Sequence, residues 1–420
     1  HSKTIIIILT FTLTNLTLTM QQAYIINGIR TAIGNFGGTL STVRTDDLAA
    51  FVLKELISKN QNVNFNDVGD VILGCANQAG EDNRNIARMS SLLAGLPISV
   101  PGVTVNRLCA SGLSASIDAA RAIQVGDENL MIAGGVENMT RGPLVMSKAS
   151  SAFGRDQQLF DSSFGWRFIN PKMKEQFGVD AMGDTAENVA EKYKISKEDQ
   201  DKFALWSQQK ATKAQSDGRF AKEISALAIP QKKGDAINFA ADEFIKPKTT
   251  LEGLAALKPS FKKDGTVTAG NASGLNDGAA AILFASETGI KSSNSKPLAR
   301  IVSSAVVGVE PRIMGIGPVE ASNKALKRAG LTFKDIDIIE LNEAFAAQAL
   351  ACTRSWGLAD NDERINPNGG AIALGHPLGM SGARILLSAA IQLQLTNKKY
   401  ALATMCIGVG QGYAVVIERC

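Results

Sequence analysis

The chain has 420 residues, of which 45% are hydrophobic and 20% are charged, and its formal net charge is +4. This composition is ordinary for a soluble globular protein of two or three domains, and it excludes a disordered chain. The mild positive charge would suit an acidic substrate. No basic stripe or base-stacking motif accompanies it, so we expect no binding of nucleic acid.

Two features bear on the compartment of the protein. An apolar run at residues 5–11 imitates the core of a signal peptide, but only Lys3 precedes it and no small-residue cleavage site follows before Met20. We expect residues 1–19 to be an extension from cloning or upstream translation, with Met20 as the natural start. No other stretch is long enough to span a membrane. The five cysteines are widely spaced, with no C-x-x-C pair, which predicts free thiols in a reducing cytoplasm.

Short apolar runs alternate with segments of helical periodicity, which predicts an α/β fold with buried strands. The runs lie at residues 23–26, 71–73, 130–133, 336–341 and 401–405.

Two segments of the chain, 111–124 and 381–394, match each other at an offset of 270 residues. Each opens with Ser-Gly, continues as an apolar helix with paired alanines, and is followed by a predicted strand and glycines. Chance could produce a match this short. An internal duplication would instead place Cys109 and His376 on corresponding loops of two similar halves, facing one another across a pseudo-dyad.

Cys109 lies between a strand-like segment at 103–105 and a helix that begins near Ser111. Unpaired N–H groups and the positive end of the helix dipole lower the pKa of such a cysteine from about 8.5. This setting predicts a nucleophile. The alternative is a small buried cysteine of the core.

Residues 141–275 are charged and Lys-rich, and we interpret them as an inserted cap domain. Ser196, with Asp199 three residues later, is typical of a helix N-cap, and the helix it starts carries Phe203 and Trp206. Most of the charge runs in this range are expected to be solvated surface.

Asn342 and His376 are the candidate partners of Cys109. Asn342 follows the predicted strand at 336–341, where an asparagine is most often a helix cap but can also hold a water that donates to a developing negative charge. The only other histidine is His1. The glycines and prolines at 366–382 predict a loop without a regular element, which favours a functional His376 over a structural one.

Cys406 ends a predicted strand and precedes the alternating glycines of CIGVGQG. Such glycines expose backbone N–H groups that can receive an oxyanion. The G-x-G-x-G spacing and the absence of a following helix with an acidic ribose partner exclude a dinucleotide site.

Four segments, NRLCASG, NEAFA, GHPLGMSG and CIGVGQG, occur in this order, and together they resemble the thiolase family from Met20 to the C-terminus. The resemblance implies two tandem βαβαβαββ halves stacked as five αβαβα layers. It places the N-terminal half at 20–140, completed by 276–296, a loop domain that contacts coenzyme A at 141–275, and the C-terminal half at 297–420. It also implies a homodimer or homotetramer, coenzyme A as co-substrate, and no permanently bound cofactor or metal.

The resemblance assigns roles to the matching residues. Cys109 would be the acylated nucleophile, His376 its activating base, and Cys406 the acid and base at the α-carbon of acetyl-CoA. Asn342, through a water, and His376 would bind the enolate oxygen, whereas the N–H groups of Cys109 and Gly408 would bind the acyl-enzyme oxyanion. The positions that contact coenzyme A or line its channel would be Ser273, Lys246, Phe261, Met182 and Phe345. Family members often have three glycines after the last cysteine, whereas Ile407 and Val409 flank Gly408 here.

The substrate is predicted from two further segments. Short-chain acetoacetyl-CoA members commonly carry a histidine where this chain has Ala181, whereas GCANQAGEDNRN at 74–85 and GWRFINP at 165–171 resemble the 3-oxoadipyl-CoA thiolases of bacterial aromatic degradation. We therefore expect thiolytic cleavage of 3-oxoadipyl-CoA to succinyl-CoA and acetyl-CoA, as in the β-ketoadipate pathway. An arginine can pair with the distal carboxylate, and the candidates, each otherwise a surface or interface residue, are Arg84, Arg155 and Arg167.

Other functions remain as alternatives. The chain could be an acetoacetyl-CoA thiolase or a broad 3-ketoacyl-CoA thiolase of fatty acid metabolism. A β-ketoacyl synthase would have a second histidine at Asn342 and lack Cys406, and a Cys-His-Asn hydrolase would have its residues in another order. A non-catalytic lipid- or acyl-CoA-binding relative would have lost one of Cys109, His376 or Cys406, and none is lost.

Overall fold

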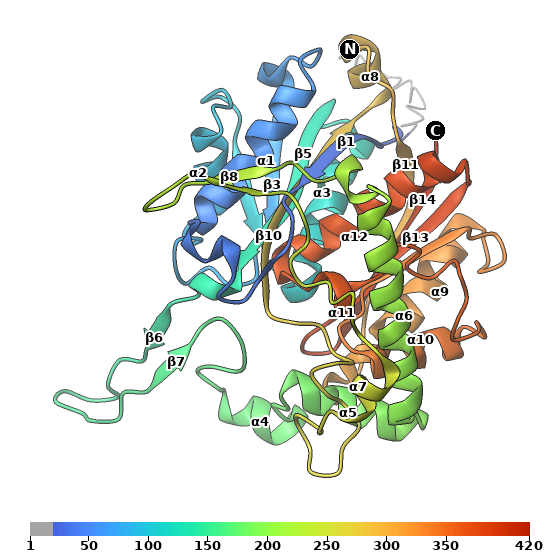
Figure 1. Cartoon of the computed structure of the whole chain (residues 1–420). Helices are drawn as coiled ribbons and strands as arrows, with labels where there is room; N and C mark the ends of the chain where they lie inside the picture. The colour runs from blue at the N-terminus through green and yellow to red at the C-terminus, as the bar shows by residue number, and fades with distance from the viewer. Residues whose placement is uncertain (1–19) are drawn as a thin grey trace, which may run out of the picture.

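The structure is a computed structural model that describes residues 20–420, so the expectation for residues 1–19 lies outside the described residues. Most strands belong to one ten-stranded sheet (Figure 1). Its first half contains β1 (Tyr24–Arg30), β2 (Gly34–Asn35), β3 (Val68–Gly74), β4 (Gly102–Val105), β5 (Leu130–Asn138) and β10 (Asn276–Ala285). Its second half contains β11 (Ala299–Gly308), β12 (Ile338–Leu341), β13 (Tyr400–Ile407) and β14 (Gln411–Arg419).

The two halves repeat one pattern of strand pairing. In the first half β3 is parallel to β5, and β10 lies antiparallel between β5 and β1. In the second half β12 is parallel to β13, and β14 lies antiparallel between β13 and β11. Residues 24 and 25 of β1 pair with β11, which links the sheets of the two halves at this edge. The repeated pattern supports the internal duplication that the sequence suggested.

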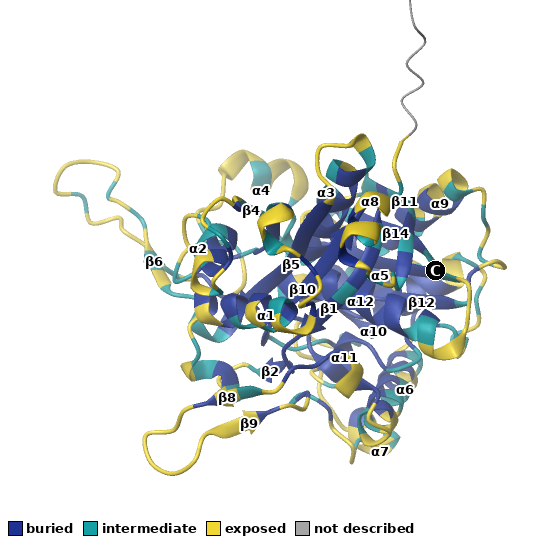
Figure 2. Ribbon diagram, turned by 90° about the horizontal axis from the view of Figure 1, so that it is seen from above, coloured by how far each residue is buried: buried dark blue, intermediate teal, exposed yellow. Residues whose placement is uncertain are grey.

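Helices cover both faces of each half. The outer helices are α1 (Thr45–Lys59), α2 (Ile86–Leu93), α8 (Glu287–Ser293), α9 (Gly317–Ala329) and α10 (Ala346–Ser355). The inner helices α3 (Ser111–Val125) and α12 (Leu378–Thr396) pack against each other, and α12 contacts strands of both halves. The short α11 (Ala371–Leu374) contacts α6 (Lys197–Ser216). Most residues of α3 and α12 are buried, and Figure 2 shows α12 and the strands as the buried centre. The α/β fold with two similar halves is confirmed.

Two glycines permit the close contact of α3 with α12. A Cβ on Gly112 of α3 would lie 2.5 Å from the backbone oxygen of Gly379 and 3.0 Å from the nitrogen of Ala383. A Cβ on Gly382 of α12 would meet the backbone of Leu113 in the same way. Gly112 and Gly382 occupy matching positions in the duplicated Ser-Gly pairs. Because these glycines bring the two helix N-termini together, they also bring together the loops that carry Cys109 and His376.

The chain between β5 and β10 forms smaller elements at the side of the sheet. They are β6 (Leu144–Met146), β7 (Leu159–Asp161), α4 (Pro171–Phe177), α5 (Met182–Tyr193), α6 (Lys197–Ser216), β8 (Leu227–Ile229), β9 (Ile237–Phe239) and α7 (Leu251–Ala255). The pair β6–β7 projects from the body of the protein (Figure 1). Ser196 caps α6 as predicted, since its side chain accepts a hydrogen bond from the Asp199 nitrogen. The domain boundaries given above remain predictions.

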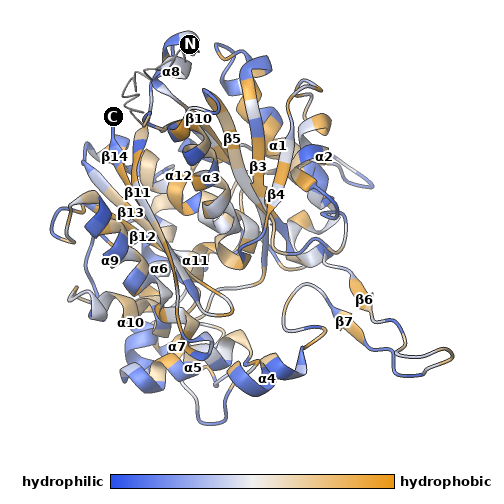
Figure 3. Ribbon diagram, turned by 180° about the vertical axis from the view of Figure 1, so that it is seen from behind, coloured by the Kyte–Doolittle hydropathy of each residue, from blue (hydrophilic) through white to orange (hydrophobic). Residues whose placement is uncertain are grey.

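The predicted strands are present, with small shifts at their ends. β12 begins at Ile338 rather than 336, because the carboxylate of Asp337 instead accepts hydrogen bonds from the Lys399 and Tyr400 nitrogens. Apolar residues concentrate on the central strands and on α12, whereas the outer helices present polar residues (Figure 3). Within residues 20–420, no helix has the length and apolar character needed to cross a membrane.

Candidate active site

Cys109 sits in a single 3-10 turn, Leu108–Ala110, between β4 and α3. The turn is fixed by its neighbours: the Leu108 nitrogen donates to Asn106 Oδ1 at 2.8 Å, and the Ser111 hydroxyl donates to the Leu108 oxygen at 2.7 Å. Leu108 itself has a φ of 47°, a left-handed conformation that a leucine adopts only under strain. The side chain of Cys109 is half-buried at the N-terminus of α3, as the sequence predicts.

The expected lowering of the Cys109 pKa is wrong. Burial raises the pKa of this thiol above its ordinary value, and the nearby Glu137 carboxylate raises it further. Hydrogen bonds from the backbone N–H groups of Gly408 and Cys109 act in the opposite direction without offsetting burial. Desolvation therefore outweighs the helix N-terminus, and the resting thiol needs a base to remove its proton.

The structure places His376 between α11 and α12 with its backbone locked. The His376 nitrogen donates to Asn276 Oδ1 at 2.9 Å. Gly375 has a φ of 101°, and a Cβ there would lie 2.5 Å from Asn276 Cγ, so only glycine fits. The expectation of a loop without regular structure at 366–382 is wrong, because α11 and the start of α12 fall within it. These helices make the turn rigid.

The hydrogen bonds of His376 define which ring nitrogen carries the proton. Nδ1 lies 2.7 Å from the Ser381 hydroxyl, and this hydroxyl donates its one proton to the Pro377 oxygen at 2.8 Å. Ser381 must therefore accept from Nδ1–H, which leaves a lone pair on Nε2. Burial lowers the pKa of His376 to about 3, and the charge of Arg384 contributes to the lowering. The imidazole is thus neutral, with the lone pair of Nε2 facing Asn342.

Asn342 faces this nitrogen from the end of β12. Its Nδ2 lies 3.4 Å from His376 Nε2, and its backbone nitrogen donates to the Thr404 oxygen at 3.0 Å. Asn342 Oδ1 is buried and has no hydrogen-bond partner among the described residues. Asn342 is not a helix cap, because α10 begins only at Ala346. An unpartnered buried oxygen costs free energy unless a water or a ligand satisfies it.

Cys406 lies at the end of β13 and is buried. Burial raises the pKa of its thiol well above the ordinary value, and the charge of the Cys109 thiolate raises it further. Both effects disfavour the charged form of Cys406. Cys406 therefore holds its proton while Cys109 is ionised.

Gly408 lies two residues after Cys406 and close to the loop that carries Cys109. A Cβ at this position would lie 3.2 Å from Leu108 Cδ1 and 3.8 Å from Met182 Sδ. Val409, where family members often have glycine, has a φ of 63°, which is strained for a β-branched residue. This chain therefore has valine where family members often have glycine, and the backbone of Val409 is strained as a result.

The five expected channel residues fall into two places. Phe261 and Phe345 pack edge to face, with 6.3 Å between their ring centroids, and Phe345 belongs to the same buried cluster as Cys406. Met182 lies near Gly408. The Ser273 hydroxyl donates to the Ala344 oxygen at 3.0 Å, next to Phe345. Lys246 instead lines an open pocket beside α6, with Gln208 and Lys213 among its other lining residues.

Sequence reasoning missed the residues that hold the catalytic candidates in place. Asn276 lies 100 residues before His376, so only the fold brings them together. Ser381 is five residues after His376 on the first turn of α12, a spacing that could have suggested a partner.

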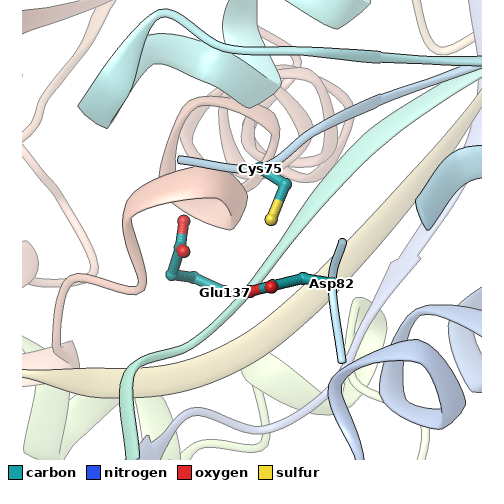
Figure 4. Close-up of side chains that lie close together, drawn as sticks. All are labelled: Cys75, Asp82 and Glu137. Carbon is teal, nitrogen blue, oxygen red and sulfur yellow. The ribbon is translucent and has the colours of Figure 1, made fainter. Parts of the chain in front are cut away.

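Glu137 was missed as well, and it forms a buried group with Cys75 and Asp82 (Figure 4). Such donors could hold a metal ion. However, the Glu137 carboxylate accepts hydrogen bonds from the nitrogens of Ala76, Asn77 and Gly379. These bonds satisfy it without an ion, and they tie the start of α12 to the end of β3.

Comparison with known proteins agrees with this arrangement. Residues 23–288 match the family model of the thiolase N-terminal domain, and residues 295–419 match that of the thiolase C-terminal domain. The chain is 59% identical to the 3-oxoadipyl-CoA/3-oxo-5,6-dehydrosuberyl-CoA thiolase of Escherichia coli (strain K12), over 95% of this chain and 100% of the relative. It is likewise 59% identical to a beta-ketoadipyl-CoA thiolase of Acinetobacter baylyi, with the same coverage.

Solved structures lead to the same family. The crystal structure of human mitochondrial 3-ketoacyl-CoA thiolase in complex with CoA has a TM-score of 0.87 at 41% identity, covering 96% of this chain and 99% of that one. One explanation covers the repeated halves, the approach of Asn342 to His376, the effect of Cys109 on the pKa of Cys406, and these matches. The chain belongs to the thiolase family and is an acyltransferase.

Proposed function

We propose that the protein cleaves 3-oxoadipyl-CoA with coenzyme A to give succinyl-CoA and acetyl-CoA. Two observations support this chemistry. The neutral imidazole of His376 lies beside Asn342, and Cys109 lies near enough to Cys406 for its charge to raise the pKa of that thiol. The substrate is supported by relatives named for 3-oxoadipyl-CoA and beta-ketoadipyl-CoA that align over nearly the whole chain.

The first step is attack on the ketone. His376 Nε2 accepts the proton of the Cys109 thiol, and the thiolate adds to C3 of the substrate. The oxyanion that forms receives hydrogen bonds from the N–H groups of Cys109 and Gly408. A preformed lone pair on Nε2 suits this role, because the Ser381 hydroxyl already holds the proton on Nδ1.

The second step breaks the bond between C2 and C3. The electron pair of that bond passes to the departing fragment, which becomes the enolate of acetyl-CoA. His376 and a water held by Asn342 donate to the enolate oxygen, and the unpartnered Oδ1 of Asn342 supports such a water. The Cys406 thiol gives its proton to C2, and the raised pKa of this thiol keeps that proton available.

The third step releases the acyl group from Cys109. Coenzyme A gives its thiol proton to the Cys406 thiolate, and its sulfur attacks the Cys109 thioester. Succinyl-CoA leaves, and the Cys109 sulfur regains the proton held by His376. The three steps return both thiols and the imidazole to their starting states, and no other reactant is consumed.

The proposal also includes the binding site of coenzyme A and the assembly of the protein. Met182, Phe261, Phe345 and Ser273 line the channel of coenzyme A, and Lys246 contacts it from the pocket beside α6. The protein acts in the cytoplasm as a homodimer or homotetramer without a permanent cofactor. The apolar side chains of Leu144, Met146 and Leu159, exposed on the projecting β6–β7 pair, support an assembly.

A substrate panel tests this function. Coenzyme A-dependent cleavage of 3-oxoadipyl-CoA, acetoacetyl-CoA and a longer 3-oxoacyl-CoA is followed by mass spectrometry of both products. We expect the highest kcat/KM for 3-oxoadipyl-CoA. An equal or higher value for acetoacetyl-CoA would favour a short-chain thiolase, and binding without any cleavage would favour a non-catalytic relative.

A further inference from the structure

A small pocket opens beside the two cysteine loops. Its lining residues come from the loop region and from the turns that follow β11 and β13, and they are Trp166, Phe177, Gly178, Asp180, Met182, Thr185, Pro311, Arg312 and Val409. Val409 follows the expected oxyanion donor Gly408, and Met182 lies against the same glycine. The pocket therefore adjoins the loop that carries the expected oxyanion donor Gly408.

Arg312 is the cationic residue of this pocket. Its Nε donates to Asp180 Oδ2 at 2.9 Å, and the Asn188 side chain donates both to that oxygen, at 3.0 Å, and to the Arg312 backbone oxygen, at 2.9 Å. Within residues 20–420, the terminal nitrogens of Arg312 have no hydrogen-bond partner, and the side chain is 57% exposed. One edge of the guanidinium is thus fixed, while its outer end remains available to a carboxylate.

The arginines that the sequence suggested do not line this pocket. The guanidinium of Arg167 donates to the Ser162 oxygen at 3.2 Å. Arg155 lies on the exposed segment between β6 and β7, which projects away from the body (Figure 1). Arg84 is exposed in the turn before α2. The segment GWRFINP contributes Trp166 instead, whose Nε1 donates to the Asp180 oxygen at 3.1 Å.

We propose that Arg312, held in place by Asp180, binds the distal carboxylate of a dicarboxylic 3-oxoacyl chain, with Trp166 and Met182 beside the methylene groups. The proposal rests on the proposed function and identifies the part of the site that selects this substrate class. A planar guanidinium can accept a carboxylate through two parallel hydrogen bonds. The apolar residues of the pocket offer a carboxylate no hydrogen bond. An acyl chain that ends in a methyl group, in turn, forms no hydrogen bond with Arg312.

The charges around the pocket limit how strongly Arg312 can favour a dicarboxylic substrate. Asp180 and Glu310 both lie near Arg312, and Lys192 is 3.8 Å from Glu310. These four charges sum to zero, and the outer end of Arg312 meets solvent. We therefore expect a preference of roughly tenfold rather than thousands, as for a charged hydrogen bond in a partly exposed site.

The test compares two substrates of equal length, 3-oxoadipyl-CoA and 3-oxohexanoyl-CoA, which differ in a carboxylate against a methyl group. In Arg312→Met we expect kcat/KM for 3-oxoadipyl-CoA to fall roughly tenfold, mainly through KM, with 3-oxohexanoyl-CoA unchanged. Arg312→Lys should recover part of the loss, because it keeps the charge without the bidentate geometry. Arg155→Met is the matched control and should behave as the unaltered enzyme.

The outcomes separate this proposal from the proposed function. If the unaltered enzyme prefers 3-oxoadipyl-CoA and Arg312→Met keeps that preference, Arg312 is not the carboxylate ligand, although the function stands. A loss of the same size for both substrates would also contradict the proposal. If the unaltered enzyme shows no preference for the dicarboxylic substrate, the substrate assignment is wrong, and so is the proposed role of Arg312.

Discussion

Nε2 of His376 lies 3.4 Å from Nδ2 of Asn342, although 34 residues separate them and they belong to different elements. With the Nδ1 proton engaged by Ser381, the imidazole presents a lone pair to the space that it shares with Asn342. The same geometry fixes the imidazole in one tautomer and one orientation. Much of the proposed chemistry depends on that orientation.

The first prediction concerns the Ser381 hydroxyl. Ser381→Ala removes the acceptor of Nδ1–H, so the imidazole can rotate or change tautomer. We expect the rate of Cys109 acylation to fall roughly five- to a hundred-fold, which corresponds to about 1–3 kcal/mol for an unpaired buried donor. Ser388→Ala on the same helix is the control, because its hydroxyl contacts Glu223 rather than His376. Equal acylation rates in the two variants would remove Ser381 from the mechanism.

The second prediction concerns pH. The pKa of His376 is lowered to about 3 in the folded protein, whereas an unfolded histidine titrates near 6.5. Between these values the unfolded chain binds the extra proton, so stability falls as the pH falls from about 6.5 towards 3, by at most about 1.4 kcal/mol per pH unit. Thermal unfolding midpoints of the unaltered protein and His376→Gln, at equal concentration, should converge as the pH falls. A constant difference from pH 7 to pH 4 would contradict a buried neutral imidazole.

A third prediction separates the roles of the two thiols. Cys406→Ser should leave acylation of Cys109 largely intact but abolish exchange of solvent deuterium into the methyl group of acetyl-CoA, because a hydroxyl is a much weaker acid than a thiol and so neither donates its proton readily nor ionises to act as a base. Cys352→Ser is a control for the loss of a buried thiol, since Cys352 lies in α10 with its sulfur 3.4 Å from the Gly315 oxygen. Undiminished exchange in Cys406→Ser would exclude Cys406 as the proton donor and acceptor.

A fourth prediction concerns the contact between α3 and α12. Gly112→Ala would place a methyl group 2.5 Å from the Gly379 oxygen, and we expect a loss of at least about 1–3 kcal/mol in the free energy of unfolding. Gly253→Ala is the control, because its Cβ would meet only Thr250 Oγ1 at 3.3 Å and alanine favours a helix. Equal unfolding midpoints for these two variants would show that α3 and α12 can move apart without a loss of stability.

Local patterns predicted the features that depend on neighbouring residues. The apolar runs marked β1, β5 and β13, Ser196 marked the start of α6, and the duplicated Ser-Gly pairs marked two helices that meet in the structure. The roles of Cys109 and His376 came from their motifs, and they stay predictions until tested.

Features that depend on distant residues could not be predicted. The raised pKa of Cys109 follows from burial by segments from several parts of the chain, so the local signal of a helix N-terminus gave the wrong direction. Asn276 reaches His376 across 100 residues, and Arg312 reaches Asp180 across 132. Neither hydrophobic periodicity nor motif spacing predicts such contacts, because they form only when the fold brings distant segments together.

The identity of the acylated residue tests the proposed mechanism most directly. The protein is incubated with acetyl-CoA, quenched in acid and digested, and the mass of each cysteine-containing peptide is measured. We predict one acetyl group, on the peptide that contains Cys109, in both the unaltered protein and Cys406→Ser. Acetylation confined to Cys406, or its persistence in Cys109→Ala, would contradict the assignment of Cys109 as the nucleophile.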